Sequence, residues 1–313
     1  HQPEEAIKEW EKSRDLDGTF AIVHRNLAIS YEQVEKDIPK AISSMESAVE
    51  CNSNDPRLFY ELDLLYEKGV VSAAKRLSLL EAHRDTVEQR DDAMSRIVLL
   101  YVQTARYDEA IQLLATRHFH VWEGSRGLRD AYVDAYLMRG LDRSAAGQFQ
   151  EALEDYQKAL QFPFNLENAW PYRGGRTAEI FCFIAAGYEA LGEEEKAREF
   201  YRKAVEAKQR MEWSHLRYYQ AAALRKVGRE DEAEELLDGL LEFASTEVGS
   251  SVGFFSKFGE KESLNVRKAR NHYLSGLAYL GKGMEEEARA EFTESLSLDS
   301  RNVWARIQLS RIT

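Results

Sequence analysis

The chain has 313 residues, of which 44% are hydrophobic and 31% are charged, and its formal net charge is −12. No apolar run reaches the roughly 18 residues that span a bilayer, and the acidic balance argues against nucleic acid or an anionic membrane as a partner. Its two cysteines, Cys51 and Cys182, lie far apart on predicted helices. They predict no disulfide and favour a cytoplasmic location.

The first residues are typical of a helix. The chain starts at His1 rather than methionine, and Pro3 suits a first helical turn. The residues that follow match the second helix of a helical hairpin, at Ala6, Trp10 and Ser13. Because the first helix of that hairpin is missing, we expect the chain to be a fragment of a longer polypeptide.

Apolar and small residues then recur at spacings of three, four and seven, which predicts a series of paired helices. The paired stretches are 24–31 with 41–48, 59–66 with 74–82, 94–101 with 110–114, 136–140 with 152–159, 181–188 with 197–204, 221–228 with 233–237, and 276–283 with 288–292. The second helix of the 59–66 pair matches the common pattern poorly. A final stretch, 302–309, is expected to be a helix that caps the last apolar face.

The clearest pair resembles the tetratricopeptide repeat, a helical hairpin of about 34 residues. The residues that carry the resemblance are Phe181, Ile184, Ala185, Tyr188, Gly192, Ala197, Tyr201 and Ala204. The resemblance implies an all-α fold, a right-handed α-solenoid or superhelix of about seven hairpins plus terminal helices. It also implies that the first helices of the hairpins line a concave groove.

Three irregular insertions interrupt the repeats, near 117–127, 162–176 and 243–263. We expect residues 1–313 to form a single solenoid with these insertions as loops at helix ends. With their FHVWEG and FPFNL sequences, the insertions resemble those of bacterial proteins in which a β-sandwich domain of unknown function precedes a tetratricopeptide region. That resemblance implies an upstream β-sandwich similar to sugar-binding sandwiches.

The first insertion contains two histidines that flank Phe119. In an extended segment His118 and His120 point to the same side, with Trp122 and Glu123 nearby. One interpretation is a metal or acid/base cluster, but no third ligand stands at suitable spacing, so no metal is predicted. A second is that Phe119 and Trp122 fill a gap between hairpins while the histidines bond to backbone. A third is contact with a ligand or partner.

The second insertion mixes aromatic, amide and cationic side chains. Asn165, Trp170 and Arg173 suit stacking on and hydrogen bonding to a sugar or a partner surface. Trp170 equally suits covering a hydrophobic helix end.

Within the groove, basic and aromatic side chains recur in pairs. The pairs are Arg57 with Tyr60, His215 with Tyr218, and Arg270 with Tyr273. Such pairs inside an acidic molecule favour an acidic peptide or a polar ligand.

No catalytic motif is present, and GLAYLGKG at 276–283 lacks the serine or threonine and the preceding strand of a phosphate-binding loop. We therefore assign no catalytic residue and no cofactor, and expect this fragment by itself not to be an enzyme. The leading hypothesis is a non-catalytic scaffold that binds a protein or peptide, or its own upstream domain, through the groove and loops. The alternative is the helical portion of a carbohydrate-active or carbohydrate-binding protein, whose loop residues complete a site shared with the upstream β-sandwich.

Overall fold

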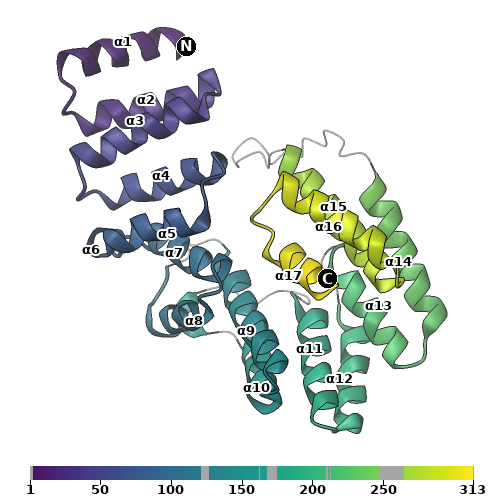
Figure 1. The fold of residues 1–313 in the computed structure, drawn as a ribbon. Helices are drawn as coiled ribbons and strands as arrows, with labels where there is room; N and C mark the ends of the chain where they lie inside the picture. The colour runs from purple at the N-terminus through teal and green to yellow at the C-terminus, as the bar shows by residue number, and fades with distance from the viewer. Residues whose placement is uncertain are drawn as a thin grey trace. The chain divides into compact units, whose positions relative to one another are not determined.

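The chain folds into α-helices that pack as consecutive hairpins, which confirms the all-α prediction (Figure 1). The computed structural model describes residues 3–120, 127–161, 163–167, 175–208, 211, 213–246 and 264–312. No β-strand occurs within those ranges.

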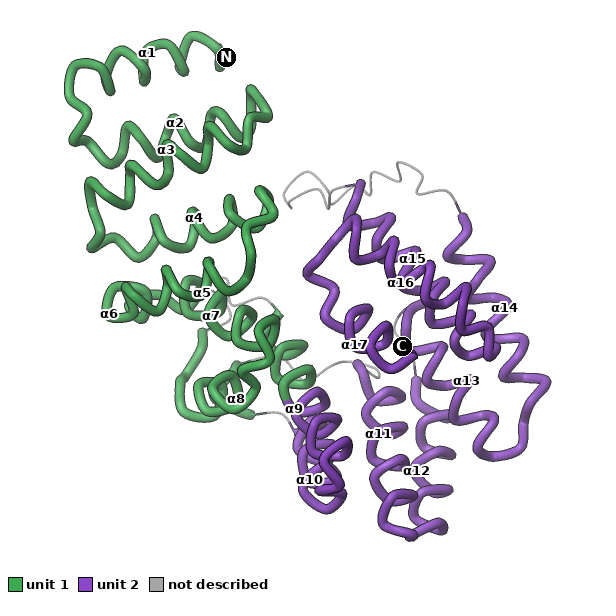
Figure 2. Tube along the Cα trace, viewed as in Figure 1, with its two compact units in different colours: residues 1–135, 162–168 green, residues 136–161, 169–313 purple. Residues whose placement is uncertain are grey.

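The helices group into two compact units (Figure 2). Unit 1 comprises residues 1–135 and 162–168, and unit 2 comprises residues 136–161 and 169–313. Each unit has its own buried apolar residues, so each is described by itself below.

Unit 1 is built from short helices in chain order. They are α1 (Pro3–Leu16), α2 (Ala21–Ser30), α3 (Ile38–Cys51), α4 (Pro56–Lys68), α5 (Ala73–Ala82), α6 (Arg84–Val87), α7 (Asp91–Gln103) and α8 (Tyr107–Thr116). A π-helical turn, η1 (Tyr31–Glu35), extends α2, and a 3₁₀ turn, η3 (Phe164–Leu166), packs against α8. Helix α9 (Leu128–Ala145) begins in unit 1 and ends in unit 2.

Acidic caps and prolines fix where α3 and α4 begin. The side chain of Asp37 accepts from the backbone N–H of Lys40 at 2.9 Å at the start of α3. Asp55 does the same at α4, directly before Pro56. Both arrangements satisfy backbone donors that have no partner inside the helix, and proline fits the first turn because its missing N–H is not needed there.

A repeated tyrosine–glutamate hydrogen bond ties each hairpin of unit 1 to the next. The hydroxyl–carboxylate pairs are Tyr31 with Glu11 at 2.8 Å, Tyr66 with Glu46 at 2.6 Å, and Tyr101 with Glu81 at 2.9 Å. Each tyrosine stands 20 residues after its glutamate, and successive tyrosines are 35 residues apart. We call these three pairs the tyrosine ladder.

Each ring of the ladder also has a cation over its face. The distances to the ring centroid are 3.7 Å for Lys40 over Tyr31, 5.5 Å for Lys75 over Tyr66 and 4.6 Å for Arg106 over Tyr101. A cation over an aromatic face is attracted by the ring's quadrupole. The same three-part contact is thus made at three successive helix junctions.

Unit 2 has longer and more regular hairpins. Its helices after α9 are α10 (Phe149–Ala159), α11 (Thr177–Ala190), α12 (Glu194–Glu206), α13 (Leu216–Lys226), α14 (Glu230–Ser245), α15 (Leu264–Gly281), α16 (Glu285–Leu298) and α17 (Val303–Arg311). In the α11–α12 hairpin Ala185 and Ala197 are buried, as the sequence predicts. In the α15–α16 hairpin a Cβ on Gly276 would stand 2.6 Å from the ring of Phe292, so only glycine allows this approach.

The last helix, α17, is the predicted capping helix. Ala305 is fully buried in a cluster with Leu277 and Phe292, and Trp304 packs against that cluster. The ring of Trp304 also lies 5.9 Å, centroid to centroid, from Phe183 of α11. Helix α17 therefore covers the final hairpin and also contacts α11, from an earlier hairpin of the same unit.

The two units close their hairpins with different residues. In unit 2 the turn residues Gly192, Gly228 and Gly283 have φ of 75°, 79° and 75°. In unit 1 the left-handed positions at helix ends are held by Lys36, Val70 and Ala105, with φ of 59°, 57° and 58°. Side chains with a Cβ are disfavoured in this region, so unit 1 holds backbone strain that unit 2 avoids.

Candidate functional site

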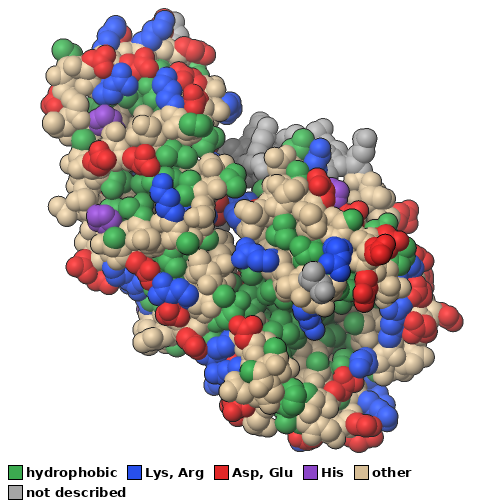
Figure 3. Space-filling model, in the orientation of Figure 1, with side chains coloured by type: hydrophobic (Ala, Val, Ile, Leu, Met, Phe, Trp, Pro, Cys, Tyr) green, Lys and Arg blue, Asp and Glu red, His purple; other side chains and the backbone are tan. Residues whose placement is uncertain are grey.

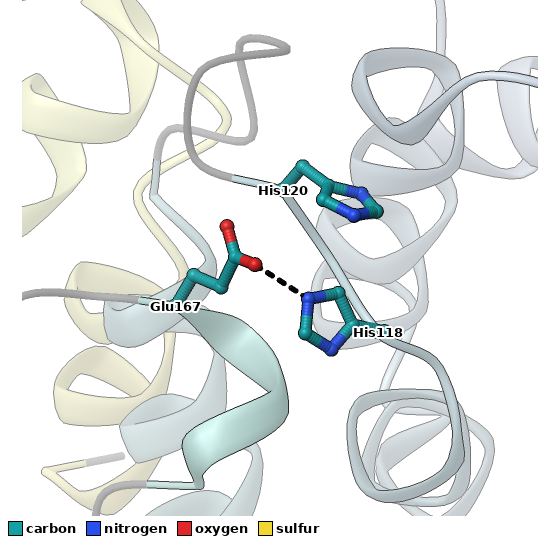
Figure 4. Close-up of side chains that lie close together, drawn as sticks. All are labelled: His118, His120 and Glu167. Atoms are coloured by element: carbon teal, nitrogen blue, oxygen red, sulfur yellow. Dashed lines mark hydrogen bonds and ion pairs between the residues drawn. The ribbon is translucent and has the colours of Figure 1, made fainter.

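The described ends of the first two insertions meet in unit 1, where three potential ligand side chains converge. His118 and His120 stand on one extended segment, and Glu167 reaches them from the residue after η3 (Figure 4). The Nε2 atom of His118 lies 2.6 Å from Oε1 of Glu167, and the two imidazole centroids are 4.7 Å apart. Glu167 is the ligand that the sequence did not reveal, because 49 residues separate it from His118.

A buried carboxylate holds His120 in place. Asp91 accepts from the backbone N–H of His120 at 2.9 Å and contacts its Nδ1 at 2.8 Å. Arg117 Nη2 lies 2.7 Å from the other oxygen of Asp91. Burial alone would raise the pKa of Asp91, but the backbone and side chain of His120, together with Arg117, lower it below its usual value. The carboxylate is therefore charged at neutral pH.

The segments that carry these side chains are joined by backbone contacts. Phe119, which is fully buried, donates its N–H to the carbonyl of Asn165 at 2.8 Å. The side-chain amide of Asn165 donates to the carbonyl of Leu114 at 2.8 Å and to that of Arg117 at 2.6 Å. The amide nitrogen of Asn165 thus stabilises the local fold, and contact of Asn165 with a ligand stays a prediction.

Several predicted loop residues cannot be placed. Trp122, Glu123, Trp170 and Arg173 lie outside the described residues. The side chains of the two histidines contact carboxylates: His118 pairs with Glu167, and His120 pairs with Asp91. The interpretations of the insertions as a docking or carbohydrate site remain predictions.

The predicted groove residues of unit 1 lie on α4. Arg57 is exposed and forms an ion pair with Asp55 at 3.2 Å, and Tyr60 is half-buried. Their exposed parts leave the prediction of partner contact open.

The predicted groove residues of unit 2 differ in exposure. Arg270 is exposed, whereas Tyr218 is half-buried beside three apolar clusters. Tyr273 is only 8% exposed, because it belongs to the cluster that also contains Ala305 of α17. The spacing of apolar residues did not predict that α17 would pack in the same cluster as this tyrosine.

His215 lies beside a buried charge that the sequence analysis missed. Glu179 of α11 is 1% exposed; its Oε2 lies 2.6 Å from Nε of Arg176 and 3.7 Å from Nε2 of His215. Burial raises the pKa of Glu179, but Arg176 and His215 outweigh it and lower the pKa to about 2. The pattern of small and aromatic residues in α11 gave no signal for this site, because it records packing and not charge.

Unit 2 also contains a cleft of about 760 Å³ that the sequence analysis did not predict. Its lining comes from α14, α15 and α16 and combines apolar with polar side chains. Leu241, Leu264 and Tyr279 provide apolar surface, and Lys268 and Asn271 provide polar groups. His272 and Glu291, paired at 2.7 Å, form a further part of the lining.

On the face of the molecule seen in Figure 3, acidic and basic side chains are interspersed over both units. The excess of acidic residues is therefore spread over solvated helix surfaces rather than gathered in one patch on that face. Among the described helices, none has the length and apolar character needed to cross a membrane.

Comparison with known proteins identifies part of the chain. The tetratricopeptide repeat model matches residues 178–210 and 269–302. The photosystem I assembly protein Ycf3 of Rippkaea orientalis (strain PCC 8801 / RF-1) is 26% identical over 141 residues, which are 44% of this chain and 76% of that protein.

Among solved structures, the chain is similar to a tetratricopeptide repeat protein from Parabacteroides merdae ATCC 43184, with 12% identity, coverage of 98% and 99% of the two chains, and a TM-score of 0.47. It is also similar to YrrB, described as a TPR protein with an unusual peptide-binding site, with 17% identity, coverage of 63% of this chain and 91% of that chain, and a TM-score of 0.41. The stretches matched by the family model correspond to the α11–α12 and α15–α16 hairpins. Two hairpins of this all-α chain of consecutive helical hairpins therefore match the tetratricopeptide repeat model.

Proposed function

We propose that this chain is a non-catalytic scaffold that binds a protein or peptide partner. The observation that supports this most directly is the cleft between α14, α15 and α16, because two of its three helices match the tetratricopeptide repeat model. Its volume of about 760 Å³ is large enough for several side chains of a bound segment. Clefts that join apolar surface with a few polar groups are the usual binding sites of proteins.

The lining favours a short segment with an apolar side chain next to an acidic group. Leu241, Leu264 and Tyr279 suit the apolar side chain. The ammonium group of Lys268 attracts one carboxylate, whereas Glu242 and Glu291 also line the cleft and disfavour a strongly acidic segment. Asn271 offers an amide that can pair with the backbone of an extended peptide.

The partner is either a separate protein or another domain of the same polypeptide. Ycf3 is named as an assembly protein, which is consistent with the scaffold class and does not identify a partner for this chain. The upstream β-sandwich implied by the insertion sequences is the second candidate partner.

A peptide selection tests the proposal. The purified chain, residues 1–313, is immobilised, a random peptide phage library is selected on it, and recovered peptides are measured by isothermal titration calorimetry. We expect peptides with one carboxylate next to apolar residues. We also expect Lys268→Glu to lower their affinity about tenfold, which corresponds to about 1.4 kcal/mol. Asn271→Ala should also lower the affinity for these peptides.

Arg202→Glu is the matched control, since Arg202 is exposed on α12 and does not line the cleft. Its affinity should stay within about twofold of the unsubstituted chain. Equal losses for Lys268→Glu and Arg202→Glu would show a general charge effect and remove the cleft from the proposal. Failure to select any peptide would contradict the proposal that the cleft binds a peptide segment.

A further inference from the structure

The cluster of His118, His120 and Glu167 has the composition of a metal site. One potential ligand atom from each residue lies within 4.8 Å of the other two. All three belong to unit 1, and Figure 4 shows the carboxylate of Glu167 pointing toward the ring of His118, while the ring of His120 lies 4.7 Å from that of His118. Two imidazoles and one carboxylate form a donor set that zinc accepts in proteins, with a fourth position left for water or another ligand.

We propose that His118, His120 and Glu167 bind a divalent transition-metal ion, with zinc as the preferred ion. Imidazole nitrogen suits zinc, whereas calcium and magnesium take oxygen ligands, so a site with two histidines favours the transition metals. Histidine pairs that only stabilise a fold do not require a third donor, and here Glu167 supplies one.

The contacts around His120 are those expected of a metal ligand's supporting residues. Asp91 lies 2.8 Å from Nδ1 of His120, and Arg117 in turn holds Asp91. When Nδ1 carries the proton and donates it to Asp91, the lone pair of the ring is on Nε2, the atom that would bind the ion. Carboxylates that orient a ligating histidine in this way are a regular feature of zinc sites.

The backbone around the cluster is fixed before any ion binds. Phe119, between the two histidines, is fully buried and bonds through its N–H to Asn165, two residues before Glu167. The side chain of Asn165 adds bonds to the carbonyls of Leu114 and Arg117. The two ligand-bearing segments are thus held together by contacts independent of the ligands.

Closing the cluster around an ion requires only small side-chain movements. With zinc–ligand distances of about 2.0–2.1 Å, donor atoms in a tetrahedral site are about 3.3 Å apart. The widest spacing here is 4.8 Å or less, and the His118–Glu167 contact is 2.6 Å. Binding therefore separates His118 and Glu167 slightly and replaces their hydrogen bond with two metal bonds. The proton between Nε2 of His118 and the carboxylate passes to solvent.

Direct titration tests the site. The chain is stripped with EDTA, dialysed, and titrated with zinc chloride by isothermal titration calorimetry at pH 7.5. We expect one high-affinity ion per chain. The affinity for zinc should fall at least tenfold in each of the variants His118→Ala, His120→Ala and Glu167→Gln. Asp91→Asn changes the residue that positions His120 and should lower the affinity for zinc by about 10- to 100-fold without changing the stoichiometry.

The chain offers a control with the same chemistry and no third donor. His272 pairs with Glu291 at 2.7 Å in unit 2, and no other residue completes a metal-ligand group with them in the described part of the chain. His272→Ala should leave zinc affinity and stoichiometry unchanged. If His272→Ala lowers the affinity for zinc as much as His118→Ala does, the ion is bound by scattered surface groups and the proposal is wrong.

Cobalt provides a second readout that reports the donor set. Cobalt(II) added to the stripped chain should give visible absorption bands of a four- or five-coordinate site, and these bands should be lost in the double variant His118→Ala/His120→Ala. Circular dichroism of that variant checks that it is folded. Absence of zinc binding by the unsubstituted chain, or unaltered binding by a folded double variant, would overturn the proposal. Neither result bears on the peptide cleft, which lies in unit 2.

Discussion

Asp63 and Arg76 form a two-point ion pair in the interior of unit 1. Nε and Nη2 of Arg76 lie 2.8 and 2.9 Å from the two oxygens of Asp63, and the residues are 2% and 1% exposed. Arg96 joins them, with Nε at 2.5 Å from Asp63 and Nη2 at 2.8 Å from Glu67. Every charge in this network faces an opposite one, which is the condition under which buried charges are tolerated.

Asp63→Ala should therefore be strongly destabilising, because it leaves two buried guanidinium groups without their main partner. We expect a loss of about 3–5 kcal/mol in the free energy of unfolding, measured by urea denaturation followed by circular dichroism. Lys12→Ala is the control, since the Lys12–Glu9 pair has side chains that are 69% and 71% exposed. That control should change stability by less than about 1 kcal/mol. Equal effects of the two substitutions would contradict this account.

Tyr66→Phe removes one hydroxyl of the tyrosine ladder while keeping the ring and its contact with Lys75. Burial, together with the hydrogen bond to Glu46, raises the pKa of Tyr66, so the hydroxyl is neutral and donates. A hydrogen bond to a charged group contributes about 1.5–3 kcal/mol, so we expect a loss at the lower end of that range. Thermal denaturation of Tyr31→Phe, Tyr66→Phe and Tyr101→Phe should give similar losses, and a neutral result at all three would show that the ladder does not stabilise unit 1.

Val70→Gly should stabilise unit 1, although it removes a hydrophobic side chain. Val70 is 74% exposed and has a φ of 57°, a conformation that costs a side chain with a Cβ about 1–2 kcal/mol. Glycine avoids that strain, but ordering its more flexible backbone on folding costs about 0.5–1 kcal/mol. The free energy of unfolding should therefore rise by about 0.5–1 kcal/mol. Val71→Gly is the matched control: Val71 is not among the positive-φ residues, so this change should be destabilising. Chemical denaturation of both variants checks the sign.

Glu179→Gln should change how stability depends on pH. The pKa of Glu179 is lowered from 4.5 to about 2, so the folded state binds fewer protons than the unfolded state between these values. The ion pair therefore stabilises the fold fully above pH 4.5, by about 3 kcal/mol, and progressively less as the pH falls toward 2. Urea denaturation at pH 7 and at pH 3 should show a large deficit for the variant at pH 7 and a smaller one at pH 3.

The exposed substitution Glu195→Gln controls for the loss of a carboxylate, because the side chain of Glu195 is 92% exposed. Its stability should follow that of the unsubstituted chain at both pH values. A deficit in Glu179→Gln that stays constant across the pH range would rule out the ionised carboxylate as its cause.

Sequence periodicity predicted the hairpins because it records which residues pack. Ala185 and Ala197 are buried, and Gly276 lies against the ring of Phe292, as the small size of these residues implied. The stretch 74–82 matched the pattern poorly, and the structure gives the reason: Arg76, a charged residue, occupies a buried position in α5. The grouping into two units had no such signal, and the prediction of a single solenoid stays untested.

The candidate sites were less predictable because they combine residues far apart in the chain. His118 and His120 were recognised by their alternation, but Glu167 and Asp91 come from other segments, 49 and 29 residues away from the histidines that they contact. The cleft of unit 2 likewise needs three helices. Conversely, Tyr273 was expected in an open groove and is buried, because periodicity does not say which surface the final helix will cover.

The constant 35-residue step of the tyrosine ladder makes unit 1 a modular structure. A segment cut from one ladder tyrosine to the next carries one glutamate, one tyrosine and one cation, so whole steps repeat the ladder contacts. The buried pairs of Asp63 with Arg76 and Arg96 join two successive steps, so an engineered chain could be shortened or lengthened by residues 32–101 together, which keeps both the ladder and these ion pairs matched.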